Sequence, residues 1–334
     1  MFNNKNLLIT GGTGSFGSAF IKKVAQTYKP KKIIIFSRDE LKQFEMKKKI
    51  NKSKIKNFRF FIGDVRDRER VFVALKNVDI VVHAAALKQV DAAEYNPTEA
   101  IKTNIIGAEN IISASIENKV DKIIALSTDK ACSPINLYGA TKLVSDKLFI
   151  SANNIKGLTR CKFSVLRYGN VMASRGSVVP IFIEQKKNKQ TLTVTSVNMT
   201  RFSLTINEGL NFAIDSLKMM IGGEIFVPKI PSYRILDLIK AIDSRNKYKI
   251  IGLRPGEKNH EELISSSDSL STIETKKFYI ITPNSEVTPW KKENFAKKNK
   301  LKKINFLKKE FSYSSFNNKN FLSVSQIKEL IKKI

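Results

Sequence analysis

The sequence contains little of what disulfide-rich and zinc-binding folds require. Its 334 residues include only two cysteines, Cys132 and Cys161, and only two histidines, His83 and His260. Two cysteines allow at most one bridge, and so few thiol and imidazole groups supply no ligand set for a structural zinc ion. We therefore expect no metal, and the cysteine usage indicates a reducing cytoplasm.

Long hydrophobic runs are also absent. No stretch approaches about 18 uncharged apolar residues, the length that a membrane-spanning helix needs. The apolar run that begins at Leu7 is too short for a secretory signal, and no small-residue cleavage site follows it. We therefore expect a cytoplasmic protein without a membrane partner, whose chain begins almost at its first strand.

Acidic residues are scarce beside basic ones, with 30 Asp and Glu against 59 Lys and Arg and a formal net charge of +29. Such an excess favours nucleic acids, anionic lipids or phosphorylated metabolites as partners. RNA-binding motifs typically interleave basic and aromatic residues, and we find no such segment in the sequence. We interpret the charge as surface composition, expect no nucleic acid partner, and expect the lysine-rich stretch 289–310 to be a loosely structured, solvated segment.

Apolar residues, by contrast, make up 42% of the chain, which is ample for a packed core. In the first half, apolar runs alternate with helically spaced segments, which predicts right-handed crossovers and a parallel sheet. We expect an α/β fold, with a Rossmann-type doubly wound sheet in residues 1–170. Residues 171–334 are expected to form mainly a smaller mixed α/β substrate-binding lobe, with some segments returning to the sheet. The apolar runs span residues 7–9, 33–36, 58–62, 80–82, 123–126 and 163–166.

A glycine-rich segment, TGGTGSFG at residues 10–17, follows the first apolar run directly, and helical periodicity begins at Ala19. Glycine permits a tight turn and lets a pyrophosphate approach the backbone, while the helix start beyond it offers unpaired N–H groups. A strand before and a helix after make this a strong signal for dinucleotide binding. The residues expected to contact the dinucleotide here are Gly11, Thr13, Gly14, Ser15, Phe16 and Gly17.

Residues about 20 positions further on bear on which dinucleotide binds. Related folds usually place an acidic residue there to hold the adenosine ribose. This chain has Ser37 and Arg38, whose hydroxyl and guanidinium suit a 2′-phosphate, before Asp39. We therefore expect NADP rather than NAD. The further contacts expected at the ends of the third and fourth strands are Asp64 and Val65 beside the adenine, and the small residues Ala84, Ala85 and Ala86.

The candidate chemistry follows the fifth apolar run, in the segments Ser127-Thr128-Asp129-Lys130 and Tyr138-Gly139-Ala140-Thr141-Lys142. Tyr138 and Lys142 lie four residues apart and share one helix face. A lysine ammonium near a phenol lowers the pKa of the tyrosine, so Tyr138 becomes a usable general acid and base beside a nicotinamide. Thr128 could orient the same substrate hydroxyl. His83 is expected to be buried and hydrogen-bonded rather than catalytic.

Together these segments resemble the extended short-chain dehydrogenase/reductase family. Within it, IIFSRDELKQFEM, HAAALKQV, STDKACSPINLYGATK, MTRF and RPGEK are similar to the inverting UDP-N-acetylglucosamine 4,6-dehydratases, which start pseudaminic acid synthesis for flagellin or surface glycans. The similarity runs from about Leu7 to His260 and reappears at 311–318. Ser203 is a departure, because the family usually has tryptophan at that position.

The resemblance implies an NADP-dependent hydro-lyase that holds its cofactor tightly and regenerates it in each turnover. C4 of UDP-N-acetylglucosamine is oxidised, water leaves across C5 and C6, and a hydride returns to C6. The product would be UDP-2-acetamido-2,6-dideoxy-β-L-arabino-hex-4-ulose. Lys130 would be the base and Asp129 the acid of the elimination, with pKa values shifted by burial and by each other. A homo-oligomer, often a hexamer, is also implied.

The two phosphates of a UDP-sugar suit guanidinium groups, which offer forked donors. We expect Arg175, Arg201 and Arg254 to bind them. By resemblance, the other substrate contacts are Lys88, Asn170, Gly176, Ser177, Val178, Thr195 and Tyr313, and the other cofactor contacts are Glu40, Leu41, Lys42, Lys88, Tyr138, Lys142 and Val171.

Alternatives of two classes stay open. A retaining nucleotide-sugar 4,6-dehydratase or a 4-epimerase would use the same Tyr138 and Lys142, although an epimerase needs no acid–base pair such as Asp129 and Lys130. A non-enzymatic NADP-binding regulatory module would use the glycine segment and would not depend on Lys130.

Overall fold

The computed structural model describes residues 1–51, 57–172, 177–245, 247–284, 286–301, 304–307 and 309–333. Its largest sheet is built from β1 (Asn6–Thr10), β2 (Lys32–Ser37), β3 (Phe58–Ile62), β4 (Ile80–His83), β5 (Lys122–Thr128), β6 (Lys162–Tyr168), β9 (Ile225–Pro228), β13 (Thr272–Glu274) and β14 (Phe278–Ile281). The strand order is β13-β14-β9-β6-β5-β4-β1-β2-β3. Strands from β3 to β9 pair in parallel, and β14 and β13 continue antiparallel. This confirms the predicted α/β fold with a doubly wound sheet.

The apolar runs of the sequence form β1 to β6 because helices cover both faces of the sheet there. Central strands covered on both sides are largely apolar, and β4 is buried at every position. The strand β3 differs, because it carries Arg59 and is only partly buried. It lies at the edge of the sheet, where a charged side chain reaches water.

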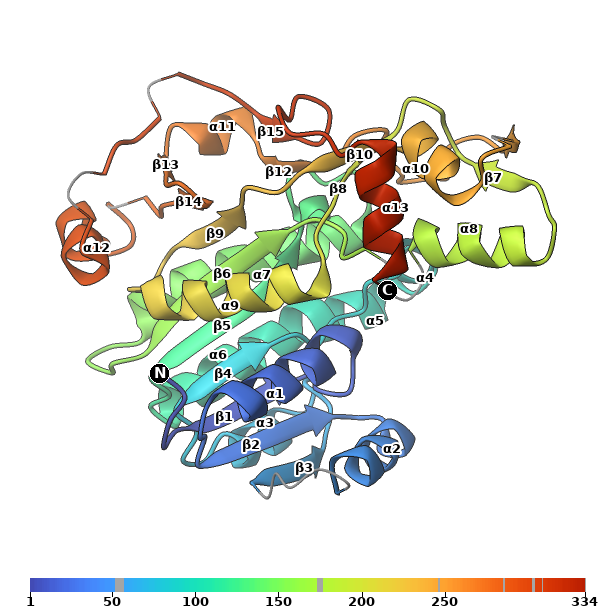
Figure 1. Ribbon diagram of the computed structural model, residues 1–334. Coiled ribbons are helices and arrows are strands. Elements are labelled where there is room, and N and C mark those ends of the chain that lie inside the picture. Colours follow the sequence, from blue (N-terminus) through green and yellow to red (C-terminus); the bar gives the residue numbers. More distant parts are fainter. Residues whose placement is uncertain are drawn as a thin grey trace.

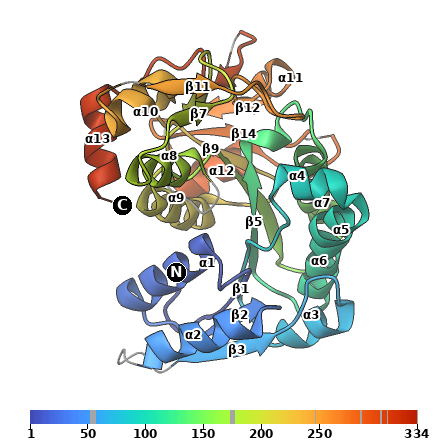
Figure 2. The same cartoon turned by 90° about the vertical axis from the view of Figure 1, so that its right-hand side faces the viewer.

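Helices lie on the two faces of this sheet (Figure 2). On one side, α1 (Ser15–Thr27) packs against α9 (Ile206–Met219), and on the other α6 (Gly107–Glu117) packs between α3 (Arg68–Ala74) and α7 (Leu137–Ile155). The remaining helical elements before β6 are α2 (Glu40–Asn51), α4 (Val90–Tyr95), α5 (Pro97–Ile101), the π-helical η1 (Lys102–Ile106) and the 3₁₀ turn η2 (Asp129–Ala131).

A smaller lobe stands beyond the carboxyl ends of β5 and β6 (Figure 1). It has its own apolar core, which includes Phe182, Leu238 and Ile327. Its helices and two-stranded pairings are α8 (Val178–Lys187), α10 (Ile235–Ile242), α13 (Val324–Lys332), β7 (Leu192–Val194) with β11 (Tyr248–Ile250), and β8 (Thr200–Phe202) with β10 (Ser232–Arg234). The pair β12 (Glu262–Ile264) and β15 (Tyr313–Ser314) and the short α11 (Ser266–Ser269) complete the described elements of this part of the chain.

The lysine-rich stretch differs from our expectation of a solvated segment. Residues 292–299 form α12 (Lys292–Asn299), whose Phe295 is fully buried. The indole of Trp290 is buried as well and donates a hydrogen bond to Glu224 at 3.1 Å. These aromatic residues therefore anchor the helix next to α9, while Glu293, Asn294 and Lys297 on its outer side are exposed.

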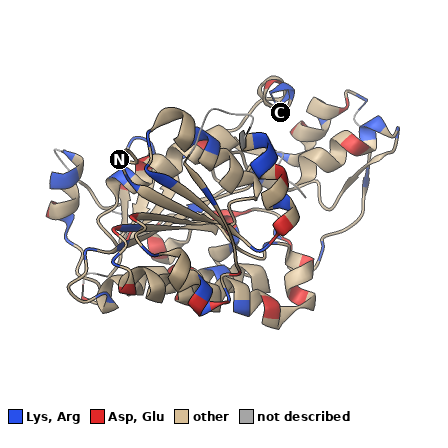
Figure 3. Ribbon diagram, turned by 90° about the horizontal axis from the view of Figure 1, so that it is seen from below, with Lys and Arg blue, Asp and Glu red and all other residues tan. Residues whose placement is uncertain are grey.

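Basic and acidic residues are interspersed along the helices and loops around the sheet (Figure 3). Among the residues that the structure describes, no helix combines the length and the apolar character needed to cross a bilayer.

Candidate functional site

The glycine segment forms a tight turn between β1 and α1. Gly11 has φ +62°, and a Cβ at this position would lie 3.0 Å from backbone atoms of Ala84. A Cβ on Gly17 would lie 2.6 Å from the carbonyl oxygen of Gly11. Only glycine fits at these two positions, and Gly14 caps α1 without a side chain over its first N–H groups. The turn therefore provides the close backbone approach and the open helix start that a pyrophosphate needs.

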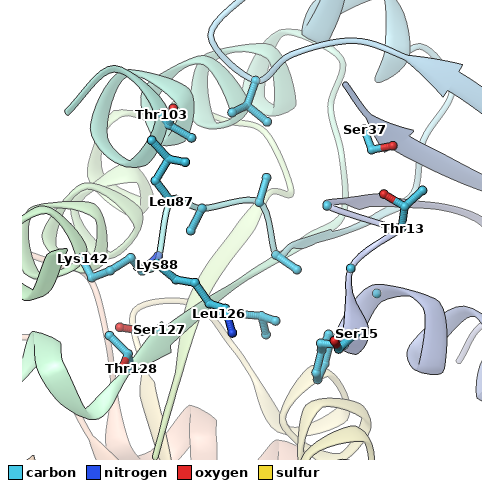
Figure 4. Close-up of a pocket in the computed structure, with 18 of the residues that line it drawn as sticks. Thr13, Ser15, Ser37, Leu87, Lys88, Thr103, Leu126, Ser127, Thr128 and Lys142 are labelled. Carbon is cyan, nitrogen blue, oxygen red and sulfur yellow. The ribbon is translucent and has the colours of Figure 1, made fainter. Parts of the chain in front are cut away.

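A cavity of about 560 Å³ opens beside this turn, along the carboxyl ends of the parallel strands. Figure 4 shows Thr13 and Ser15 on one side of it and Ser127, Thr128 and Lys142 on the other. Of the residues predicted to contact a dinucleotide, Glu40 and Leu41 do not line it, because they lie on α2 outside the cavity wall. Those that do line it are Gly11, Thr13, Gly14, Ser15, Phe16, Gly17, Ser37, Arg38, Asp39, Lys42, Asp64, Val65, Ala84, Ala85, Ala86, Lys88, Tyr138, Lys142 and Val171.

The end of the cavity that would hold the adenosine ribose contains charges of both signs. The carboxylate of Asp39 accepts hydrogen bonds from the backbone N–H of Lys42 at 2.9 Å and from its Nζ at 2.5 Å. These bonds lower the pKa of Asp39. Arg38 is half exposed and lies 3.6 Å from Asp64, a weak ion pair. The Asp39 carboxylate is thus already bound by Lys42, while the Arg38 guanidinium remains accessible from the cavity.

Thr128, Asp129 and Lys130 lie where β5 passes into η2. The Thr128 hydroxyl donates to Oδ1 of Asp129 at 3.0 Å, and Nζ of Lys130 lies 3.1 Å from the same oxygen. Asp129 is fully buried and lines neither cavity, whereas Thr128 forms part of the wall of both. The Asp129 carboxyl therefore lies just behind the wall, in contact with two side chains that reach its surface.

The electrostatics around Tyr138 differ from the prediction. Burial raises the pKa of Tyr138 to about 12, against the opposing effects of the Lys130 charge and a hydrogen bond with Thr128. Lys142 is itself buried, and this burial lowers its pKa although the charge of Asp146 opposes the change. The ammonium group that favours the Tyr138 phenolate is thus Lys130, because Lys142 is held among buried side chains next to Asp146.

Lys130 also departs from expectation. Burial disfavours its ammonium, but the charges of Asp129 and Glu261 outweigh burial and raise the pKa of Lys130. For Asp129 the direction agrees with an acid, because burial, aided by the Glu261 charge, raises its pKa despite Lys130. We expected a lowered pKa for Lys130 but did not expect a second carboxylate beside it. That carboxylate belongs to Glu261, whose Oε1 lies 2.9 Å from Nζ of Lys130.

Sequence reasoning missed Glu261. It follows His260, where the similarity to the family becomes thin, and nothing in the local sequence distinguishes it from Glu262. Antiparallel pairing of β12 with β15 places the start of this strand beside η2. Only knowledge of that contact, over 131 residues of sequence, would have pointed to Glu261.

A second cavity, of about 310 Å³, lies between the sheet and the smaller lobe. It shares Lys88, Thr128, Tyr138, Asn170 and Val171 with the first, so the two cavities meet at the candidate catalytic groups. Arg175 and Gly176 lie outside the described residues. The predicted substrate residues that line this cavity are Lys88, Asn170, Ser177, Val178, Thr195, Arg201 and Arg254.

The two described arginines of this cavity differ in their contacts. The guanidinium of Arg201 is buried and donates to the carbonyl oxygens of Thr200 and Asn259, both at 2.8 Å, and of Lys258 at 2.9 Å. Arg254 is exposed at the cavity wall. Arg201 therefore holds the 257–261 segment against β8, and Arg254 is the arginine open to an incoming anion.

Tyr313 is not brought to the cavity. Its hydroxyl donates to the carbonyl oxygen of Ile230 and accepts from the N–H of the same residue, both at 3.0 Å. Its ring packs against Phe202 and Tyr279. In this arrangement Tyr313 supports the strands behind the cavity wall.

His83 is buried and hydrogen-bonded, as the sequence predicts. The hydroxyl oxygen of Thr10 accepts from the N–H groups of Ala84 and Ala85, so its hydrogen is donated to Nδ1 of His83 at 2.8 Å. Burial lowers the pKa of His83 to about 3. The ring is therefore neutral and connects the ends of β1 and β4. No group of three or more His, Cys, Asp or Glu side chains in the described ranges is arranged to hold a metal ion.

Comparison with known proteins agrees with this geometry. The family described as polysaccharide biosynthesis protein matches residues 7–283. Two UDP-N-acetylglucosamine 4,6-dehydratases (inverting) from Campylobacter jejuni are 52% and 53% identical to this chain, over 99% of it and 98% of each relative. The UDP-glucose 4-epimerase of Rickettsia canadensis is 41% identical, over 99% of this chain and 96% of the relative.

Solved structures share this fold over all or part of the chain. Pen from Bacillus thuringiensis has a TM-score of 0.88 at 38% identity and covers 100% of this chain and 99% of its own. The dTDP-glucose 4,6-dehydratase DesIV from Streptomyces venezuelae, solved with NAD and TYD, has the same fold, with a TM-score of 0.64 at 20% identity over 76% of this chain and 86% of its own. This chain belongs to the polysaccharide biosynthesis protein family, in the branch of extended short-chain dehydrogenases/reductases that holds the inverting UDP-N-acetylglucosamine 4,6-dehydratases.

Proposed function

We propose that this protein is an inverting UDP-N-acetylglucosamine 4,6-dehydratase that catalyses the first step of pseudaminic acid synthesis. The observation that carries the proposal is the position of Thr128 and Tyr138 at the junction of two cavities, one suited to a dinucleotide and one to a sugar nucleotide. Lys130 lies in the wall of the second cavity, and the buried Asp129 lies just behind Thr128. Similarity of 52% and 53% over 99% of the chain to enzymes of that name supports the choice of substrate.

The residues of the first cavity fit a nicotinamide dinucleotide, since Gly11 and Gly17 leave backbone space where any Cβ would collide. When bound, the dinucleotide supplies the acceptor and donor of the hydride. We favour NADP, because Arg38 faces the ribose end with Ser37 beside it and the nearby Asp39 is paired with Lys42. A 2′-phosphate would gain a charge-assisted bond from Arg38 that NAD lacks.

The chain's own groups divide the proton transfers. Tyr138 takes the proton of the C4 hydroxyl, and a ketone at C4 makes the C5 proton acidic enough to remove. Lys130 then removes the C5 proton. Asp129, which lies behind Thr128 in the cavity wall, supplies the proton for the departing C6 oxygen.

The product tests this function. Purified protein is incubated with UDP-N-acetylglucosamine, and proton NMR is expected to reveal a 4-keto sugar with a 6-methyl signal and L-arabino configuration. A D-xylo product would assign a retaining dehydratase instead. Lys130→Ala is expected to abolish the product. A cellular function of the protein that is unchanged in this variant would favour a non-enzymatic regulatory module.

A 4-epimerase is the second candidate, because relatives at 41–43% identity over 99% of the chain carry the name UDP-glucose 4-epimerase. Epimerisation needs hydride transfer at C4 and no proton removal at C5. The buried Asp129–Lys130 pair has no task in that reaction, so it favours the dehydratase. Formation of UDP-N-acetylgalactosamine without a 6-methyl signal would reverse this choice.

The cofactor preference has its own test. Arg38→Ala is expected to weaken NADP binding about tenfold and to change NAD binding little, because only the 2′-phosphate loses a charged partner. Fluorescence titration with both dinucleotides measures this. Equal losses for the two would mean that Arg38 does not distinguish them.

We also assign dinucleotide binding and the catalytic groups to residues 1–170 and most substrate contacts to residues 171–334. A cytoplasmic location is in keeping with the free thiols of Cys132 and Cys161. A homo-oligomer, with a hexamer as the family-based expectation, is supported by exposed apolar side chains on neighbouring elements of one face, and light scattering would measure its size. These side chains are Tyr95, Ile101, Ile106 and Val144.

A further inference from the structure

Glu261 is a buried carboxylate at the centre of the charged cluster. It is 3% exposed, and its Oε1 lies 2.9 Å from Nζ of Lys130. Its other oxygen, Oε2, is buried and has no hydrogen-bond partner among the described residues. A buried charged oxygen without a partner is costly, so packing alone explains this residue poorly.

Charged and titratable groups face Lys130 from several elements. Asp129 accepts its hydrogen bond from the adjacent position of η2, and Glu261 accepts one from the start of the β12 segment. Glu261 is itself held by the Lys130 and Arg201 charges, which lower its pKa against the effect of burial. The other groups whose charge or titration is coupled to Lys130 are Arg201 on β8, Lys88, Tyr138 on α7 and Tyr233 on β10.

We propose that Glu261 is a positioning residue that holds Nζ of Lys130 in place and sets the pH at which Lys130 gives up its proton. This rests on the proposed function, in which neutral Lys130 breaks the C5–H bond. The electron pair of that bond forms the C5–C6 double bond as the C6–O bond breaks. The C5 proton stays on Lys130, and the proton of Asp129 leaves with the C6 oxygen as water.

The geometry gives Glu261 two opposing effects. Its negative charge favours the ammonium form of Lys130, so fewer molecules hold a neutral base at a given pH. The same charge stabilises the ammonium that forms as the C5 proton is taken, which makes Lys130 a stronger base. Removing the charge should therefore move the pH dependence of Lys130 downward and also lower the maximal rate.

Glu261→Gln tests this, with Glu262→Gln as a matched control. Gln keeps the shape of the side chain and removes the charge. Glu262 is the next residue, but its carboxylate accepts from the Ser133 hydroxyl at 2.7 Å and does not contact Lys130. Glu261→Asp, which retains a carboxylate, is a second variant, and thermal unfolding of all three verifies folding.

The first measurement needs no catalysis. Acylation of Lys130 by an amine-reactive reagent is followed by mass spectrometry across a pH series. In E261Q the midpoint is expected to fall by about one pH unit or more, and in E262Q and E261D to stay near that of the wild type. An unchanged midpoint in folded E261Q overturns the proposal.

The second measurement is dehydratase turnover against pH. E261Q is expected to lose about tenfold in maximal kcat with little change in KM, and its rising limb should move to lower pH with the labelling midpoint. If labelling shifts but the pH profile does not, Lys130 titration does not govern the reaction and the catalytic part of the proposal is overturned. If labelling shifts and wild-type protein forms no 4-keto product, the proposed function fails while control of Lys130 by Glu261 stands.

Discussion

The two cavities are built by different means. The walls of the first come from consecutive strand ends and small residues, and its defining contacts are between backbone atoms of Gly11, Gly17 and Ala84. The second cavity has apolar walls as well, but its charged side chains, such as Lys130 and Glu261, meet from segments far apart in the chain. A cavity of the first kind depends on local chain geometry, so it can form whatever side chains come from distant segments. A cavity of the second kind depends on each buried charge having its partner.

The largest effect is expected where the cavities meet. Tyr138→Phe removes the hydroxyl that would accept the C4 proton and keeps the ring, so turnover should fall by about 10²–10⁴-fold while dinucleotide affinity is retained. Product NMR and fluorescence titration measure the two quantities. Turnover within about threefold of the wild type would separate Tyr138 from the chemistry.

The two arginines test whether the second cavity combines structural and binding charges. Arg201→Ala removes three hydrogen bonds to backbone carbonyl oxygens and a charge near Glu261, and should lower the free energy of unfolding by about 2–4 kcal/mol. Arg254→Ala should leave stability unchanged and raise KM for the UDP-sugar about tenfold. Urea unfolding and steady-state kinetics distinguish them, and similar profiles for both variants would contradict the distinction.

The first cavity should instead respond to the smallest change of backbone space. In Gly17→Ala the new Cβ would lie 2.6 Å from the Gly11 oxygen, so unfolding should become easier by about 1–3 kcal/mol and dinucleotide affinity should fall. Gly209→Ala on α9 is the control, because its Cβ would make an ordinary 3.4 Å contact with Leu204. That variant is expected to be neutral or slightly more stable.

The pH dependence of stability should also reveal the buried ring behind the first cavity. Burial lowers the folded-state pKa of His83 to about 3, below its unfolded value near 6.5, so the unfolded state binds the proton first as pH falls. The contribution of neutral His83 to the free energy of unfolding is present above about pH 6.5. It is lost towards pH 3, at roughly 1.4 kcal/mol per pH unit. Between pH 7 and pH 5, urea unfolding should show wild type losing about 2 kcal/mol more than His83→Asn. Equal losses would mean that His83 is protonated in the folded state.

Much of the fold was predictable because its signals are local. The strands β1 to β6 coincide with apolar runs, of which all but the edge strand β3 are mostly buried, and Thr10 to Gly17 has the spacing of a strand, turn and helix. Trp290 and Phe295 were harder, since lysines surround them in the sequence and the apolar core that buries them comes from distant segments, α9 among them. Composition alone therefore suggested a solvated segment where a packed helix exists.

The candidate site divides in the same way. Thr128, Lys130 and Tyr138 could be found because they lie close in sequence after one strand, in a pattern with a chemical purpose. The place of Tyr313 behind the cavity wall and the binding of Arg201 to the 257–261 segment could not, because hydrogen bonds between distant segments decide them.

The sequence by itself determined the doubly wound sheet and the glycine turn, since periodicity and short spacing act over a few residues. The assignment of Asp129 and Lys130 as acid and base came from the family resemblance and stays a prediction. Tertiary structure decided the electrostatics around Lys130. Its Nζ lies between oxygens of Asp129, its neighbour in the chain, and Glu261, 131 residues away, and the pKa of a group depends on every charge within a few ångströms, whatever its position in the chain.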